Sequence, residues 1–183
     1  MDLPIKGKIV VITGVTGGIG RAIASACAKQ GAIVVGIVRD LEKVKSVPEL
    51  NSLSKEQLHL FQADLCEVEE LRKVARLIQE RLGVVHALIH NAAVHEIGSI
   101  ADSQVDVFDN LISVNVRAPL VLTQSLLPLL IEGKGQVIFI NSSVGWKSSA
   151  GISQYAASKH ALRAIADSLR EEVNRQGVKV LTS

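Results

Sequence analysis

The sequence predicts an α/β protein in which helices cover both faces of one parallel sheet, a doubly wound arrangement of about six strands. Short runs rich in Val, Ile and Leu recur at 8–12, 33–38, 58–63, 85–90, 136–140 and 178–181. Helical patterns lie between these runs, and several helices are expected to end at a glycine: Gly31, Gly83 and Gly177. Glycine adopts the left-handed conformation that ends a helix. This alternation is typical of parallel strands joined by right-handed crossovers.

The composition agrees with that architecture. Hydrophobic residues make up 48% of the chain, but there are only three Phe, one Trp and one Tyr. The core must therefore be aliphatic, which suits a sheet that is buried on both faces. No composition break or repeat divides the 183 residues, so we expect a single domain over residues 1–183.

Several classes of partner and location are not indicated. A net charge of +2 without a long basic run gives no sign of nucleic-acid binding. The longest apolar stretch, 120–131, is interrupted by polar residues and is too short to span a bilayer. The N-terminus lacks the pattern of a signal peptide. Cys27 and Cys66 form no CxxC pair, which indicates a reduced, cytoplasmic protein. The five histidines show no metal-ligand spacing, so we expect no metal (His59, His86, His90, His95 and His160).

The first strand is followed by a glycine-rich turn over residues 13–20, and the turn opens a helix predicted over 18–30. Glycines let a ligand approach the backbone, while the helix N-terminus presents free N–H groups and a positive dipole. A turn placed between strand and helix in this way predicts binding of a dinucleotide pyrophosphate. The spacing is Gly-x-x-x-Gly-x-Gly. We expect cofactor contacts from Gly14, Thr16, Gly17, Gly18, Ile19 and Gly20.

The end of the second strand bears on the choice of cofactor. Val38 occupies the tip, where an acidic residue would bind the ribose diol of NAD. Arg39 follows and could pair with the 2′-phosphate of NADP, or it could be a solvated surface residue. In another register Asp40 would bind the diol. We favour NADP, with NAD as the alternative.

The third and fourth strands end in residues that can also contact a dinucleotide. Asp64, followed by Leu65, could accept a hydrogen bond from the adenine amino group, or it could cap the helix that starts near Glu67. Asn91, Ala92 and Ala93 follow the fourth strand, where small residues leave room beside a flat cofactor. The alternative for Asn91 is an ordinary turn residue.

The only tyrosine stands four residues before a lysine. On a helix, Tyr155 and Lys159 lie on one face, about 5–6 Å apart at Cβ. A cation there favours the phenolate, so the phenol can donate or accept a proton near neutral pH. Ser142 lies thirteen residues upstream of Tyr155, at the end of the fifth strand. Trp146 nearby could line a substrate pocket or cover the edge of the sheet.

In their order and spacing these residues resemble the short-chain dehydrogenase/reductase family, over nearly the whole chain. The resemblance implies a Rossmann-like fold and hydride transfer between a nicotinamide cofactor and a carbonyl or alcohol. Tyr155 would be the general acid or base, and Lys159 would assist it and bind the nicotinamide ribose. Both residues would contact the cofactor. Ser142 would hold the substrate carbonyl, and Asn115 would anchor a water that relays protons. Asn91 would support the cofactor and the central strands.

The resemblance also implies a homodimer or homotetramer, formed when helices near 120–131 and 153–175 pair across a two-fold axis.

The sequence departs from the family pattern in three places. Ala93 replaces the usual glycine, and Gly17 stands where many NADP-preferring members carry a basic residue. The sequence ends at Ser183, whereas members usually continue through a Pro-Gly turn, a substrate-covering helical segment and a seventh strand. We therefore expect this chain to bind the adenosine half of the cofactor but to transfer hydride slowly or not at all.

The sequence thus predicts an NADP(H)-dependent oxidoreductase that interconverts a small-molecule carbonyl and an alcohol. The alternative is a catalytically impaired homologue or a dinucleotide-binding sensor. A methyltransferase that uses the glycine turn to bind S-adenosylmethionine would leave the pair of Tyr155 and Lys159 unexplained.

Overall fold

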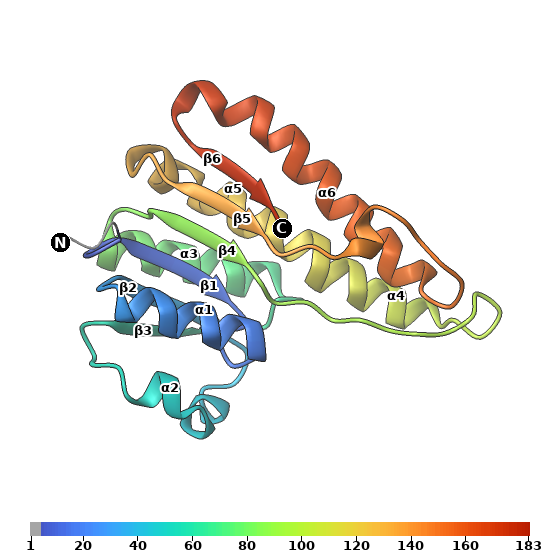
Figure 1. Cartoon of the computed structure of the whole chain (residues 1–183), viewed down its shortest axis with the longest axis horizontal. Helices are drawn as coiled ribbons and strands as arrows, with labels where there is room; N and C mark the ends of the chain where they lie inside the picture. The colour runs from blue at the N-terminus through green and yellow to red at the C-terminus, as the bar shows by residue number, and fades with distance from the viewer. Residues whose placement is uncertain (1–4) are drawn as a thin grey trace.

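The computed structural model, which describes residues 5–183, contains one six-stranded parallel sheet with the order β3-β2-β1-β4-β5-β6 (Figure 1). The strands are β1 (Ile9–Thr13), β2 (Ile33–Val38), β3 (Leu58–Gln62), β4 (Ala87–His90), β5 (Gln136–Phe139) and β6 (Lys179–Thr182). Each strand falls within two residues of the range predicted from the sequence. The predicted fold class, a doubly wound parallel sheet, is confirmed.

The helices lie in two layers. They are α1 (Gly18–Lys29), α2 (Pro48–Asn51), α3 (Val68–Leu82), α4 (Val105–Ile112), α5 (Ala118–Glu132) and α6 (Ser153–Val173). Apolar residues of α1 and α2 pack on one face of the sheet, and those of α3, α5 and α6 pack on the other. Short 3₁₀ turns occupy Glu42–Ser46, Ser143–Gly145 and Asn174–Gln176. Gly31, Gly83 and Gly177 have positive φ angles at the helix ends, as predicted.

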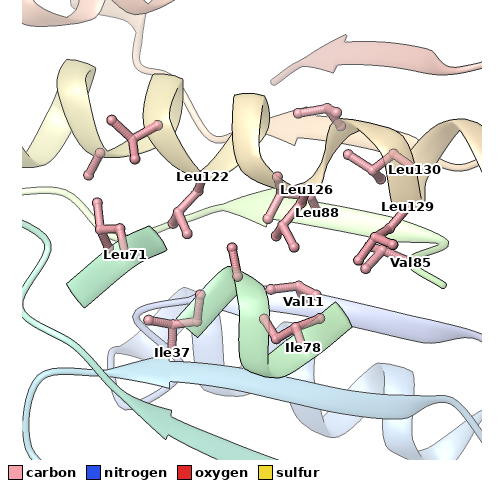
Figure 2. Packing of buried hydrophobic residues seen from close by; sticks show 14 of the residues in the cluster. Val11, Ile37, Leu71, Ile78, Val85, Leu88, Leu122, Leu126, Leu129 and Leu130 are labelled. Carbon is pink, nitrogen blue, oxygen red and sulfur yellow. The ribbon is translucent and has the colours of Figure 1, made fainter. Parts of the chain in front are cut away.

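The core is aliphatic because each central strand buries both of its faces. In β1, Val11 belongs to the cluster beneath α3 and α5, whereas Val10 and Ile12 belong to the cluster beneath α1. Figure 2 shows the larger cluster, in which Ile78 of α3 and Leu126 of α5 lie near Leu88 of β4. This packing fixes the carboxyl ends of β1, β2 and β4, where the cleft described below is located.

Helices α4 and α5 are joined by a π-helical turn, Ser113–Arg117, into one continuous helix over Val105–Glu132. By length and composition alone this helix could cross a membrane. Residues 120–131, the only stretch considered from the sequence, are too few to do so. In its most apolar window, 56% of the residues are buried inside the structure, as in the core helix of a soluble protein. The π turn contains Asn115, so the helix continues through this residue.

Candidate functional site

A cleft of about 730 Å³ lies at the carboxyl ends of the strands. It lies between β1 and β4, where the strand order reverses: the chain proceeds from β1 through β2 to β3 on one side and from β4 through β5 to β6 on the other. Among the residues lining it are eleven of those predicted to bind the cofactor: Gly14, Thr16, Gly17, Gly18, Ile19, Arg39, Asp64, Leu65, Asn91, Ala92 and Ala93. The lining therefore contains most of the predicted cofactor residues. Gly20, Tyr155 and Lys159 do not line this cleft.

The glycine turn is packed so closely that a side chain at Gly14 or Gly20 would collide with neighbouring atoms. Gly14 has φ of 71°, and a Cβ placed there would come within 3.0 Å of Ala92. A Cβ at Gly20 would collide with the carbonyl oxygen of Gly14. Gly20 thus lets α1 pack against the turn and does not face the cleft. The first turn of α1 has no side-chain cap and no acidic residue, which leaves its N–H groups and positive dipole for an anion.

Asn91 holds the glycine turn against β4. Its Nδ2 donates to the carbonyl oxygens of Thr13 (3.0 Å) and Gly14 (3.1 Å). In return, the Thr13 hydroxyl accepts from the backbone N–H groups of Asn91 (3.1 Å) and Ala92 (3.0 Å). Asn91 is therefore more than a turn-forming residue, since it fixes the turn that would receive the phosphates. The predicted site did not include Thr13.

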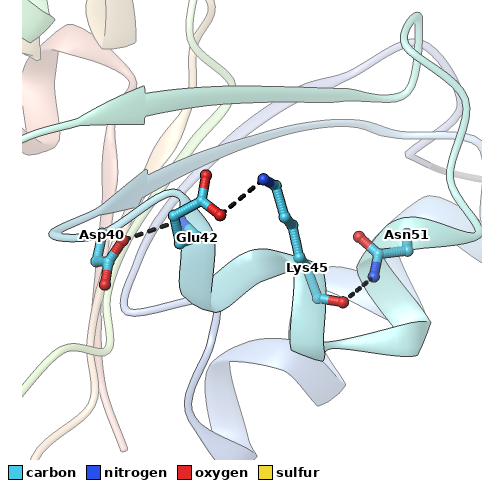
Figure 3. A network of polar contacts seen from close by, with 4 residues as sticks. All are labelled: Asp40, Glu42, Lys45 and Asn51. Atoms are coloured by element: carbon cyan, nitrogen blue, oxygen red, sulfur yellow. Dashed lines mark hydrogen bonds and ion pairs between the residues drawn. The ribbon is translucent and has the colours of Figure 1, made fainter.

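The tips of β2 and β3 line the far end of the cleft. Arg39 lines the cleft, whereas Asp40 does not. The Asp40 Oδ1 accepts from the Glu42 N–H (2.9 Å) and so starts the 3₁₀ turn drawn in Figure 3. That turn is closed by the ion pair between Glu42 and Lys45 (2.7 Å). The alternative in which Asp40 binds the ribose diol is thus less favoured than the one in which Arg39 contacts the cofactor.

Asp64 lines the cleft and also organises the turn before α3. Its Oδ1 accepts from the Cys66 N–H (2.9 Å), while its own N–H donates to Glu70 Oε2 (2.7 Å). The residue that precedes α3 is Glu67, so Asp64 is not the N-cap of that helix. Its position at the cleft is compatible with a contact to adenine.

Tyr155 and Lys159 lie on one face of α6, as the spacing predicted. The Lys159 Nζ is 5.9 Å from the centroid of the Tyr155 ring and donates to the Ile140 carbonyl oxygen (3.0 Å). Lys159 is only 2% exposed, and burial lowers its pKa to about 8. The structure therefore places the ammonium and the phenol ring on the same helix face.

Ser142 is the third residue after β5 and directly precedes the 3₁₀ turn at Ser143–Gly145. Its Oγ accepts from the Val144 N–H at 3.4 Å. The hydroxyl thus lies slightly past the strand end predicted for it, in a turn that packs against α6. Trp146, which follows, is 65% exposed and stacks against the Arg163 guanidinium at 3.5 Å, outside the cleft lining.

Asn115 connects the loop after β4 to helix α6. It is 1% exposed, and its amide accepts from the Val94 N–H (2.9 Å) and donates to the Val94 carbonyl (2.8 Å). Its Nδ2 also donates to Ser158 Oγ (3.0 Å), and that hydroxyl donates to the Tyr155 carbonyl (2.7 Å). Ser158 was missed by the sequence reasoning.

His95 was also missed as a site residue. It lines the cleft, and its ring meets that of Tyr155 edge-on, with centroids 6.2 Å apart. Tyr155 is therefore adjacent to the part of the cleft formed by the loop after β4, although it is not among the lining residues. By contrast, His90 is a core residue, stacked on Phe139 and bonded to Thr123, and burial lowers its pKa to about 3.

Comparisons with known proteins agree on one family. A family model described as short chain dehydrogenase matches residues 8–182. The chain is 34% identical to an uncharacterized oxidoreductase of Staphylococcus aureus strain MW2, over 96% of this chain and 76% of that protein. It is 33% identical to the glycine betaine reductase of Emericella nidulans, over 97% of this chain but only 14% of that protein.

Solved structures give the same result. A short-chain dehydrogenase from Streptomyces avermitilis superposes with a TM-score of 0.91 at 32% identity, covering 96% of this chain and 64% of that one. A metagenomic short-chain oxidoreductase, solved in complex with NADP, gives a TM-score of 0.89 at 30% identity over 97% and 81% of the two chains. Each of these proteins is longer than the part that this chain matches.

Proposed function

This chain belongs to the short-chain dehydrogenase family, and from that premise we propose that it is a cytoplasmic oxidoreductase. It binds NADP(H) in the cleft and interconverts a small-molecule carbonyl and an alcohol. The observation that supports this most directly is the contact between His95, which lines the cleft, and Tyr155. Through this contact the phenol lies next to a residue of the cleft that contains the glycine turn, although Tyr155 itself does not line that cleft.

The fit of the cleft to a dinucleotide supports the proposal. The glycine turn leaves a cradle that a Cβ at Gly14 would fill, and the N-terminus of α1 attracts an anion. Arg39 and Asp64 line the cleft on the β2–β3 side and would hold the adenosine half. Asn91 and the small residues Ala92 and Ala93 also line the cleft and would lie beside the other half.

The bound cofactor supplies or accepts the hydride. Tyr155 donates a proton to the carbonyl oxygen during reduction and takes it back during oxidation. Lys159 stabilises the phenolate that remains, and Ser142 donates a hydrogen bond to the same substrate oxygen. Asn115 fixes the backbone on which Tyr155 stands, through Ser158; we propose that it also positions the water of a proton relay.

The test of the proposed function has two readouts. NADPH binding is measured from its fluorescence, and turnover from loss of its absorbance with a panel of ketones, aldehydes and quinones. We expect NADPH binding and slow reduction of at least one carbonyl. Binding without turnover would favour the alternative, a dinucleotide-binding sensor or impaired homologue, and absence of binding would refute the proposal.

Arg39→Ala is expected to weaken NADPH binding far more than NADH binding. A charged hydrogen bond from the guanidinium to the 2′-phosphate is worth about 1.5–3 kcal/mol, and NADH has no such phosphate. The measurement is the ratio of the two dissociation constants. Arg72→Ala, which removes an arginine from the surface of α3, is the matched control and should leave the ratio unchanged. Equal losses for both cofactors in Arg39→Ala would show that Arg39 is only a surface residue.

We also propose that two copies pair through α5 and α6. A hollow of about 510 Å³ between these helices is lined by the aliphatic residues Leu120, Leu127 and Ile165, among others, and Leu120 is 49% exposed. A two-fold axis would bring this face against its own copy, as an isologous interface requires.

Light scattering at micromolar concentration should therefore give the mass of a dimer, or of a tetramer if a second interface forms. Ile165→Glu should give a monomer, because it places a charge in the apolar contact. Leu41→Glu, at an exposed residue outside the hollow, should leave the mass unchanged. A monomeric wild-type protein would contradict the proposal.

A further inference from the structure

The ionisable side chains that line the cleft are unevenly placed. They are Arg39, Asp64 and His95. Because the strand order is β3-β2-β1-β4, Arg39 and Asp64 lie on one side of the glycine turn, at the tips of β2 and β3. His95 follows β4 on the other side, against Tyr155. A molecule whose carbonyl reaches Tyr155 therefore meets one ionisable side chain of the lining, His95.

The backbone next to His95 is held in place relative to Tyr155, although this loop has no regular secondary structure. The preceding residue, Val94, bonds through both its N–H and its carbonyl to the side chain of Asn115. Asn115 in turn bonds to Ser158, whose hydroxyl donates to the Tyr155 carbonyl. A short chain of hydrogen bonds thus links the backbone next to His95 with the backbone of Tyr155. Such support is what positions a group for binding.

The imidazole of His95 is also available to a ligand. Ring nitrogens of His86, His90 and His160 bond to protein groups, whereas those of His95 make no hydrogen bond within residues 5–183. The side chain is exposed at the cleft, and only an edge-on contact with Tyr155 restrains its ring. A histidine carries a donor N–H in either of its neutral tautomers and when charged. It can therefore bond to an acceptor oxygen next to the phenol.

We propose that His95 selects the substrate by donating a hydrogen bond to a second oxygen, one or two carbons from the carbonyl that Tyr155 protonates. The substrate class is then a keto ester, keto acid or dicarbonyl compound, in preference to a simple ketone. This inference rests on the proposed function and names the substrate class for the same site. A site that bonds to a substrate oxygen disfavours an analogue that lacks it.

The experiment compares ethyl acetoacetate with 2-hexanone, which has one carbonyl and no second oxygen. The value of kcat/KM with NADPH is measured for wild type, His95→Phe, His95→Asn and His59→Phe. We expect wild type to prefer ethyl acetoacetate about tenfold, the effect of one hydrogen bond. His95→Phe keeps an aromatic edge against Tyr155 but should lose this preference, mainly through a higher KM. His95→Asn restores a hydrogen-bond donor and should keep most of the preference for ethyl acetoacetate.

The controls separate this inference from the proposed function. His59→Phe changes a histidine on β3, away from the cleft lining, and should retain the wild-type ratio. Binding of both ketones to protein saturated with NADP⁺ is measured by calorimetry, which requires no turnover and should give the same ratios. An unchanged ratio in His95→Phe, by kinetics or by binding, would overturn the inference while leaving the proposed function intact. Failure of wild type to bind NADP⁺ would overturn both.

Discussion

Tyr155→Phe is expected to lower carbonyl reduction by about 10²–10⁴-fold, which is the contribution of a positioned general acid. Only the hydroxyl is removed. The ring that contacts His95 and lies near the Lys159 ammonium remains, so the packing of α6 is preserved. NADPH binding should persist, because the residues that line the cleft are untouched. The measurements are single-turnover NADPH oxidation and the fluorescence of bound NADPH.

Two comparisons make this result specific. Ser142→Ala removes a hydrogen bond to the substrate oxygen and should reduce the rate less than Tyr155→Phe does, because the proton donor is retained. The melting temperature of Tyr155→Phe should stay close to that of wild type. Substantial turnover in Tyr155→Phe would assign the proton transfer to another group.

The strands and the glycine turn could be predicted because their signals are local. β1, for example, is a run of apolar residues that must bury both faces, and its alternate residues Val10 and Val11 belong to different clusters. The turn that follows is specified by glycines where a Cβ would collide. The spacing of Tyr155 and Lys159 fixes their common face on any helix.

The contacts that assemble the site could not be predicted in the same way, since they join residues that are distant in the sequence. Asn115 hydrogen-bonds to Val94 and to Ser158, and His95 meets Tyr155 only after folding brings the loop that follows β4 next to α6. Asp64 was open to two interpretations for a similar reason. The choice depended on where α3 begins, and helix boundaries are weakly specified by sequence.

The buried lysine gives a prediction for stability as well as for activity. The pKa of Lys159 is about 8 in the folded protein, below its ordinary value of 10.5, because burial disfavours the ammonium. Below pH 8 both the folded and the unfolded chain hold this proton, and the cost of burying the charge is present in full. Between about pH 8 and 10.5 the unfolded chain binds more protons, so the free energy of unfolding rises with pH through this window.

Lys159→Met should therefore raise the free energy of unfolding at pH 7, by about 2 kcal/mol. The full shift corresponds to a larger gain, but the variant loses the hydrogen bond to the Ile140 carbonyl, which offsets part of it. The advantage of the variant over wild type should shrink as pH rises from 8 to 10.5, because wild-type Lys159 becomes neutral. Turnover should be lost, since no cation then supports the phenolate of Tyr155. Denaturant unfolding at several pH values measures the first effect, and NADPH oxidation measures the second.

Lys179→Met is the matched control, because Lys179 is exposed on β6 and its replacement should change neither the stability profile nor turnover. A Lys159→Met protein that is less stable than wild type at pH 7 would mean that the ammonium is better solvated or more strongly bonded than its 2% exposure indicates. A variant that is both more stable and inactive would show that this chain retains a destabilising charge because its chemistry requires one. Such a conflict between stability and activity is expected where a charged group is buried for catalysis.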